Sequence, residues 1–206
     1  MKEKHELSLE QDCVFVNMTQ NPPSASAKYR CEKEPKIDEF FHSDYADYDM
    51  QMLGKTYAYY LKRDPNEVVA AFTIANSALV IDLLPSSRKN KINQEIPHAK
   101  HRRQYPALLL CQFAVFDDYA GNRIGDEVTQ QIKNLALLLN STTGCRFLMV
   151  EAVNKPEVLK FYERNKFLYL YSTEADEISS SKRKVDENGR LYTRVMYYDM
   201  IQYTAN

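Results

Sequence analysis

The sequence predicts an α/β fold, with a twisted mixed β-sheet of about six or seven strands and helices on both of its faces. Two observations point to this class. Apolar runs of strand length recur along the chain, and segments with the 3.6-residue spacing of amphipathic helices lie between them. In the second half of the chain the two kinds of segment alternate, which is typical of a mixed sheet connected through helices on its faces.

The composition fits one compact domain. The chain has 206 residues, of which 44% are hydrophobic, and this is enough to form a sizeable core. No internal repeat and no second core pattern is visible, so we expect a single domain over residues 1–206, with residues 1–35 weakly patterned. With 27 basic and 28 acidic side chains, the chain does not look like a protein dominated by nucleic-acid binding, although a local basic patch remains open.

The cysteines and the first residues indicate a cytoplasmic protein. The four cysteines show no C-x-x-C pairing, and we interpret them as free thiols of a reducing compartment. No apolar run reaches the roughly 18 residues of a membrane span. The charged start MKEKHELSLEQD lacks the apolar core of a signal peptide. We expect no membrane contact and no metal site.

The first fifty residues predict one strand and one helix. The run CVFVNM, residues 13–18, is a plausible short strand, and the Pro/Ser-rich residues 21–27 are a loop. Pro35 suits a first helical turn, and an aromatic face at helical spacing then continues to Gly54, a natural helix end. We interpret this aromatic face as core rather than as a surface that stacks on bases.

A β-hairpin and a long polar segment follow. Residues 55–64 and 68–76 form two strands joined by a turn at Pro65. Residues 86–106 carry six cations against one acid. This segment is either a solvated loop or an electrostatic platform for a phosphate-bearing partner. The six cations are Arg88, Lys89, Lys91, Lys100, Arg102 and Arg103.

The rest of the chain is arranged around the stretch from Ala107 to Gly125. The apolar residues 107–116 form a buried strand, a turn with Gly121 and Gly125 follows, and an amphipathic helix then extends to about Asn140. The N–H groups at a helix N-terminus are unpaired and attract anions. The sequence therefore predicts that this turn holds a phosphate group.

The last part of the chain completes the alternating pattern. Residues 145–153, 167–172 and 191–200 are predicted strands. A short helix lies between the first two, from Pro156 to about residue 165. Residues 174–190 are polar and are predicted to form a long connection between paired strands.

Two segments resemble the GNAT superfamily of acyl-CoA-dependent N-acetyltransferases. They are QFAVFDDYAGNRIGDEV at residues 112–128 and VEAVNKPEVLKFYERNKF at residues 151–167. In that family a strand ends in a pyrophosphate-binding loop, R/Q-x-x-G-x-G/A, and a later helix contains F-Y-x-x-x-G-F. The resemblance covers about residues 36–200. It is greatest for the subgroup that includes the acetyltransferase toxins acting on aminoacyl-tRNA, through G-x-T-Y at residues 54–57 and P-A-x-x-L at residues 106–110.

The chain departs from the family pattern at four positions. Ala120 stands where Arg or Gln is usual, and Arg123 stands where the middle Gly is usual. Because Arg123 carries a Cβ, we expect its backbone to avoid positive φ, while its guanidinium could pair with a CoA phosphate. Asn165 and Lys166 replace the usual x-Gly, and since Asn tolerates the left-handed region we expect the helix to stop at Asn165. The four departures therefore leave open whether the chain binds CoA more weakly than the family does.

The resemblance implies acetyl-CoA as co-substrate and direct attack of an amine on the thioester. It implies that Tyr162 is the general acid for the leaving thiolate, although alone it could be a core aromatic, and that Asn154 bonds the pantetheine arm or a water. Glu151 is a candidate general base or simply a solvated strand end. Backbone groups are expected to bind the cofactor and the oxyanion. The residues of this backbone set are Phe113, Ala114, Val115, Ala120, Gly121, Asn122, Arg123, Ile124, Gly125 and Asp126.

Two functions remain open at this point. The first is an N-acetyltransferase whose acceptor is a small amine, a protein amine or an aminoacyl-tRNA. The basic residues 88–103 and 182–184 favour tRNA, and the overall neutrality weighs against it. The second is a non-catalytic GNAT-like module that binds CoA or a protein partner, motivated by Ala120 and Arg123. The β-rich C-terminus offers an edge for a homodimer, and a cognate antitoxin remains open.

Overall fold

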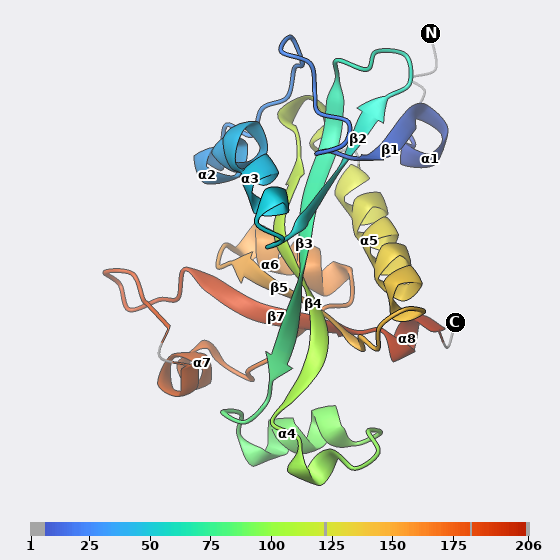
Figure 1. Cartoon of the computed structure of the whole chain (residues 1–206). Coiled ribbons are helices and arrows are strands. Elements are labelled where there is room, and N and C mark those ends of the chain that lie inside the picture. Colours follow the sequence, from blue (N-terminus) through green and yellow to red (C-terminus); the bar gives the residue numbers. More distant parts are fainter. Residues whose placement is uncertain (1–6, 122, 182, 205–206) are drawn as a thin grey trace, which may run out of the picture. The chain divides into compact units, whose positions relative to one another are not determined.

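The computed structural model describes residues 7–121, 123–181 and 183–204. Within these residues a seven-stranded sheet has the order β1-β2-β3-β4-β5-β7-β6, and helices flank it (Figure 1). The predicted mixed α/β class is confirmed. The chain divides into two compact units, Met1–Ala75 with Leu110–Asn134 (unit 1) and Asn76–Leu109 with Leu135–Asn206 (unit 2). The expectation of one domain stays a prediction.

Three antiparallel strands form the sheet of unit 1. They are β1 (Cys13–Asn17), β2 (Lys55–Leu61) and the first part of β3 (Val68–Val80). The predicted strand and hairpin are therefore confirmed, and β3 is longer than expected. A β-bulge between Tyr59 and Tyr60 shifts the register of the hairpin.

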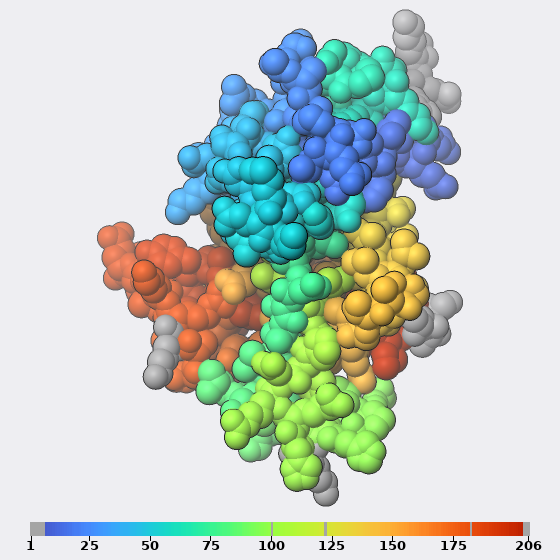
Figure 2. Space-filling model, viewed as in Figure 1, coloured from blue at the N-terminus to red at the C-terminus, as the bar shows by residue number. Residues whose placement is uncertain are grey.

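A helical segment packs on the strands of unit 1 (Figure 1). It consists of α2 (Pro35–Glu39), the π-helical turn η1 (Phe40–Asp44) and α3 (Tyr45–Met50). Its outer side forms a continuous surface in the space-filling view (Figure 2). Phe40, Phe41 and Tyr45 are buried against apolar residues of the strands, as predicted, whereas Tyr48 is exposed. This core contains Met18, Tyr29, Phe40, Phe41, Tyr45, Ala58, Tyr60, Val68, Ala71, Ala114 and Phe116.

Two elements contribute residues to both units. The strand β4 (Gln104–Val115) starts three residues earlier than predicted. The helix α5 (Ile124–Asn140) ends where predicted, but it already includes Gly125, which was expected in the turn. Between them the 3-10 turn η3 (Asp117–Tyr119) leads into the predicted phosphate-binding turn. A short helix, α1 (Leu9–Asp12), precedes β1 and was not predicted.

In unit 2 the strands β5 (Phe147–Val153) and β7 (Thr193–Asp199) are antiparallel. The two-residue strand β6 (Leu168–Tyr169) pairs with β7, and the helix α6 (Pro156–Arg164) follows β5. The predicted strand over residues 167–172 is shorter than expected, although the N–H of Leu170 still donates to the carbonyl of Val195 in β7 at 2.9 Å. The core of this unit contains Leu79, Ile81, Leu84, Ile92, Tyr105, Ala107, Phe147, Met149, Leu170, Tyr171, Val195 and Tyr197.

Unit 2 also contains helices where polar loops were expected. The segment 86–106 holds α4 (Ser86–Asn93) and the 3-10 turn η2 (Ala99–His101), and the connection 174–190 holds α7 (Glu174–Ser181). A last short helix, α8 (Ile201–Thr204), follows β7. None of the helices in the described part of the chain has both the length and the apolar character needed to cross a membrane.

Candidate active site

The root of the predicted cofactor loop is fixed by backbone hydrogen bonds in unit 1. At the end of β4, Phe116 is buried and its N–H donates to the carbonyl of Val69 at 3.1 Å. The next N–H, from Asp117, donates to the carbonyl of Arg30 at 2.9 Å. The turn η3 then closes with the N–H of Ala120 on the carbonyl of Asp117 at 3.2 Å. The loop therefore starts from a well-defined position.

A side-chain bond also anchors the loop. The hydroxyl of Tyr119, the residue before Ala120, donates to Oε2 of Glu67 in the β2–β3 turn. Burial and this carboxylate raise the pKa of the Tyr119 phenol, so the donor stays protonated at neutral pH. Sequence reasoning missed this pair, because residues 52 positions apart in the chain give no local pattern.

The loop has two residues with positive φ. Gly121 has φ +87° and open space around its Cα, and Arg123 has φ +58°. The expectation that Arg123 avoids positive φ is therefore wrong. The loop keeps a left-handed residue at this position, and a Cβ makes that conformation costly without forbidding it. Arg123 is exposed, and Asn122, also expected to contact the cofactor, lies outside the described residues.

The start of α5 presents free donors. The N–H groups of Asp126 and Glu127 donate to the carbonyl of Arg123 at 2.9 and 3.3 Å. The N–H groups of Ile124 and Gly125 have no acceptor among the described residues. Ile124 is buried and fixes the helix start, while Gly125 is half-buried. This is the arrangement of an anion-binding helix N-terminus.

The strand residues expected to hold the pantetheine arm lie directly before this loop. Phe113 and Val115 are half-buried, and Ala114, between them, is packed in the core of unit 1. The alternation places Phe113 and Val115 on one side of β4. In unit 1 the structure therefore brings together the strand end, the loop and the first turn of α5.

Tyr162 belongs to a second group of predicted residues, which lies in unit 2. It is 6% exposed on α6, with its ring edge-on to Phe161 at 5.1 Å and to Phe167 at 5.3 Å. Burial raises the pKa of its phenol, so the proton is retained at neutral pH. No group among the described residues hydrogen-bonds its hydroxyl. A protonated phenol without a protein partner is available to donate to a substrate atom.

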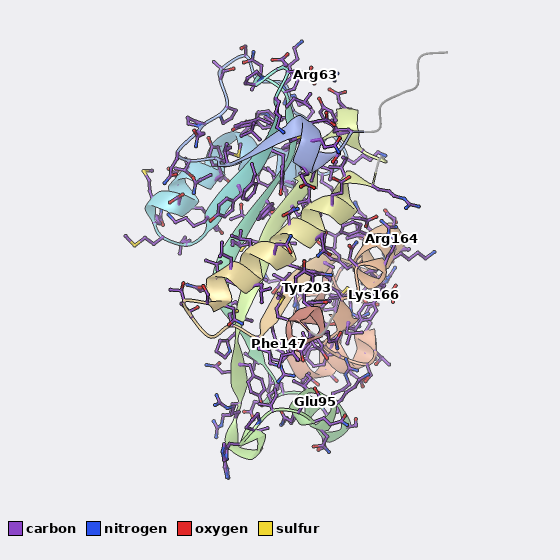
Figure 3. All side chains as sticks on the ribbon, turned by 90° about the vertical axis from the view of Figure 1, so that its right-hand side faces the viewer. Arg63, Glu95, Phe147, Arg164, Lys166 and Tyr203 are labelled. Atoms are coloured by element: carbon purple, nitrogen blue, oxygen red, sulfur yellow. The ribbon has the colours of Figure 1, made fainter. Side chains whose placement is uncertain are left out.

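The helix that carries Tyr162 ends at a left-handed cap. α6 ends at Arg164, Asn165 has φ −81°, and Lys166 has φ +67°. The N–H of Lys166 bonds the carbonyl of Glu163, and that of Phe167 bonds the carbonyl of Tyr162, both at 2.9 Å. This is a Schellman motif. The helix stop is where we expected it, but Lys166 rather than Asn165 takes the left-handed conformation. Figure 3 labels Lys166 together with Arg164, the last residue of the helix.

Asn154 is engaged with its neighbours in unit 2. Its Nδ2 donates to Oε1 of Glu174 and to the carbonyl of Leu191, each at 2.8 Å. Its Oδ1 receives Arg190 Nη2 at 3.5 Å. These bonds tie the turn after β5 to the start of α7. The expected contact of Asn154 with a pantetheine arm stays a prediction, and it would be made in competition with them.

Glu151, the candidate base, lies on β5 with a side chain that is 54% exposed. Its Oε2 accepts a hydrogen bond from Nη2 of Arg183 at 2.5 Å, and Oγ1 of Thr193 lies 3.5 Å away. The Glu151 carboxylate is therefore already engaged in an ion pair with Arg183. Arg183 is the residue that sequence reasoning missed here, since it was assigned to a basic patch.

Some of the cations in the basic segments 88–103 and 182–184 are engaged in contacts within unit 2. Arg88 donates to the carbonyls of Leu170 and Tyr169, so it connects α4 to the rest of unit 2 rather than facing a partner. Lys89 lies 3.9 Å from Asp82, and the guanidinium of Arg102 lies 5.9 Å from the ring centroid of Tyr105. The side chain of Lys100 and the whole of Lys182 lie outside the described part of the chain.

Comparison with known proteins identifies the fold. No protein-family profile and no curated protein sequence matches the chain. Among solved structures, a Tyr-to-Phe mutant of KacT has a TM-score of 0.70 and 16% identity over 95% of this chain and 99% of that chain. AtaT complexed with acetyl-methionyl-tRNAfMet has a TM-score of 0.69 and 16% identity over 94% and 98%. AtaTR bound with AcCoA has a TM-score of 0.66 and 18% identity over 94% and 97%. The GNAT-type fold expected from the sequence is thus confirmed.

Proposed function

We propose that this chain is an N-acetyltransferase that transfers the acetyl group of acetyl-CoA to a primary amine. The observation that carries the proposal is the shared fold, since AtaTR bound with AcCoA matches 94% of the chain. The loop and the start of α5 support it with N–H groups that have no acceptor among the described residues, and such groups bind a pyrophosphate without a basic side chain. The exposed guanidinium of Arg123 would add a charged contact to the same group.

The reaction is a direct acyl transfer. The amine nitrogen attacks the thioester carbonyl, the new C–N bond forms and the C–S bond breaks. A backbone N–H near Phe113 to Val115 stabilises the oxyanion, the thiolate takes the phenol proton of Tyr162, and the proton of the amine leaves to solvent or a base. Tyr162 suits its role because its hydroxyl has no competing partner among the described residues.

We infer that the acceptor amine is one that needs no strong base, and an aminoacyl ester fits this requirement. Its ammonium group is acidic enough to supply free amine at neutral pH, and the carboxylate of Glu151 is already paired with Arg183. AtaT has been solved with acetyl-methionyl-tRNAfMet, which makes aminoacyl-tRNA the first acceptor to test here. AtaT has also been solved with the C-terminus of the antitoxin AtaR, so a cognate antitoxin is the corresponding partner to seek.

Calorimetry with acetyl-CoA and a turnover assay on aminoacyl-tRNA test the proposal. We expect Tyr162→Phe to bind acetyl-CoA like the wild type and to lose about 100-fold in turnover, the usual contribution of a general acid. Tyr192→Phe is the control, because Tyr192 is 63% exposed in the same unit. Unchanged turnover in Tyr162→Phe would show that Tyr162 is not the general acid. Absence of acetyl-CoA binding at millimolar concentration would contradict the whole proposal.

A non-catalytic module that binds CoA is the second candidate. Ala120 and Arg123 favour it, since the loop lacks the polar first residue and the middle Gly of the family pattern. Acetyl-CoA binding without acetyl transfer to small amines, protein amines or aminoacyl-tRNA would support this alternative against the enzyme.

A further inference from the structure

The turn between β2 and β3 carries a carboxylate that reaches the root of the cofactor loop. Glu67, the last residue of this turn, accepts the hydroxyl hydrogen bond of Tyr119, and both residues belong to unit 1. The proposed reaction gives neither side chain a contact with acetyl-CoA, so it does not account for the pair. Tyr119 nevertheless lies directly before Ala120 and Gly121, where the pyrophosphate-binding turn begins.

Beyond Tyr119 the loop has little packing of its own. Ala120 and Arg123 are exposed, and no atom lies within 4 Å of the position that a Cβ would take at Gly121. Glycine adopts either sign of φ readily, so Gly121 does not select the shape of the turn by itself. The course of the loop therefore depends on the residues that anchor its two ends, which are Tyr119 and the buried Ile124.

The main chain of Glu67 is itself held in place. Its N–H donates to the carbonyl of Asp64 at 3.0 Å, and its carbonyl accepts the N–H of Leu61 at 3.1 Å. It also forms an isolated parallel β-bridge with Lys28, and the next residue, Val68, is fully buried at the start of β3. A side chain on such a fixed backbone gives a neighbouring loop a defined point of attachment.

The bond between the two side chains is of a strong kind. A phenol that donates to a carboxylate makes a charge-assisted hydrogen bond. Both Glu67 and Tyr119 are half-buried, so water competes for this bond less than it would at full exposure. Burial above all, and then the carboxylate of Glu67, raise the pKa of the Tyr119 phenol, which keeps the donated proton at neutral pH. The pair therefore fixes the main chain just before the loop.

We propose that Glu67 is a positioning residue for the cofactor loop and that it acts through Tyr119. The pair holds the loop in its binding conformation before acetyl-CoA arrives, so that binding does not have to order it. This inference rests on the proposed function, because it concerns the affinity of the same pyrophosphate site. The pair then determines the dissociation constant of acetyl-CoA and not the rate of the chemical step, since neither side chain is assigned to the reacting atoms.

Calorimetry with acetyl-CoA on the full chain tests this role. We expect Tyr119→Phe and Glu67→Ala each to weaken binding about tenfold, as the loss of a hydrogen bond to a charged group would. The double variant should bind no more weakly than either single variant, because both changes break the same bond. Glu67→Gln keeps an acceptor oxygen and should bind within about threefold of the wild type. In a turnover assay KM for acetyl-CoA should rise by the same factor, while kcat stays within about twofold of the wild type.

Tyr60→Phe is the matched control, because it removes a hydrogen-bonded phenol hydroxyl from the same unit. The hydroxyl of Tyr60 donates to the carbonyl of Asn21 at 2.9 Å, in the segment after β1 and not in the loop. Urea denaturation and calorimetry are applied to both phenylalanine variants. If Tyr119→Phe behaves like Tyr60→Phe, with a lower free energy of unfolding and an unchanged affinity for acetyl-CoA, the bond has a structural role alone and the inference is overturned.

The other outcomes separate this inference from the function on which it rests. Additive losses of affinity in the double variant would show that Glu67 and Tyr119 act independently, which overturns the positioning role and leaves the acetyltransferase proposal standing. Tighter binding by both Glu67→Gln and Glu67→Ala would show that the carboxylate only repels the pyrophosphate, with the same consequence. Absence of acetyl-CoA binding by the wild type overturns both proposals.

Discussion

Two cationic residues occupy left-handed backbone positions, Arg123 with φ +58° and Lys166 with φ +67°. Both stand where the GNAT pattern has Gly, which adopts this conformation without steric cost. For a residue with a Cβ the same conformation costs about 1 to 2 kcal/mol. The backbone shapes of the loop and of the helix cap are therefore retained, although the residues that would make them easiest are absent.

At the helix cap this strain serves none of the proposed functions, so Lys166→Gly should stabilise the protein. We expect the free energy of unfolding to rise by about 1 kcal/mol, measured by urea denaturation. Asn165→Gly is the control and should lower it, because Asn165 has an ordinary φ of −81° and its Nδ2 bonds the carbonyl of Phe161 at 3.0 Å. Equal effects of the two changes would contradict the strain argument.

At the loop, a change of Arg123 to glycine should have opposite effects on stability and on acetyl-CoA binding. We expect Arg123→Gly to raise the free energy of unfolding by about 1 kcal/mol, for the same backbone reason. It should also weaken acetyl-CoA about fivefold to tenfold, because a guanidinium contact to phosphate is lost. Arg123→Lys keeps the strain and a charge, so its affinity should lie between the two. Unchanged affinity in Arg123→Gly would assign the side chain to another role.

The site residues stay a prediction, and the structure tests only their local geometry. Tyr162 and the loop were proposed from motif spacing along the chain. The φ of Arg123 was predicted wrongly. A Cβ makes positive φ costly, but the surrounding loop can hold the residue in that conformation despite the cost. The partners of Asn154 and Glu151 come from α7 and the residues after it, which no local pattern connects to β5.

Among the elements, α7 is held mainly by charge. Glu177 is fully buried on it, 2.7 Å from Nε of Arg194 and 3.0 Å from the N–H of Val195 in β7. Arg183 approaches the same carboxylate at 3.7 Å. The guanidinium of Arg194 also lies 4.9 Å from the ring centroid of Tyr169. This buried carboxylate fastens the helix to β7.

Removing that carboxylate should therefore detach the helix. We expect Glu177→Ala to lower the free energy of unfolding by about 3 kcal/mol, because it leaves buried guanidinium charge without a partner. Ser179→Ala, on the exposed side of α7, should change it by less than about 0.5 kcal/mol. Urea denaturation measures both. Similar small losses would show that water replaces the carboxylate without penalty.

The elements that the sequence predicted are those held by apolar periodicity. α6 was predicted with bounds within one residue and α5 with its observed end at Asn140, since each has a regular apolar face. α4 and α7 were missed because each buries one residue among those described, Ile92 and Glu177 respectively. A single buried position gives no period to detect, and in α7 that position is charged.

For the molecule as a whole, buried tyrosine phenols determine how the free energy of unfolding changes at high pH. Burial raises the pKa of Tyr29 to about 12, and it raises the pKa of Tyr45 and Tyr197 as well. An unfolded tyrosine loses its proton near pH 10. Between about pH 10 and 12 the unfolded chain thus binds fewer protons than the folded chain, and stability falls as pH rises.

We therefore expect the urea midpoint to be insensitive to these phenols below about pH 10 and to decrease steadily between about pH 10 and 12. Tyrosinate absorbance should appear together with the loss of structure, because the buried phenols ionise only on unfolding. The exposed Tyr192 serves as the reference, and Tyr192→Phe should leave the midpoint profile unchanged. Ionisation of the buried phenols ahead of unfolding would contradict the burial argument.

The hydroxyl of Tyr162 contributes no protein hydrogen bond among the described residues, so folding gains little from it. Only selection for activity would then retain it. In a mutational library screened for soluble expression, phenylalanine at this position should be as frequent as tyrosine, or more so. In the same library screened for acetyl transfer it should disappear. Directed evolution of the chain for heat resistance alone should therefore lose the proposed general acid without a loss of stability to reveal it.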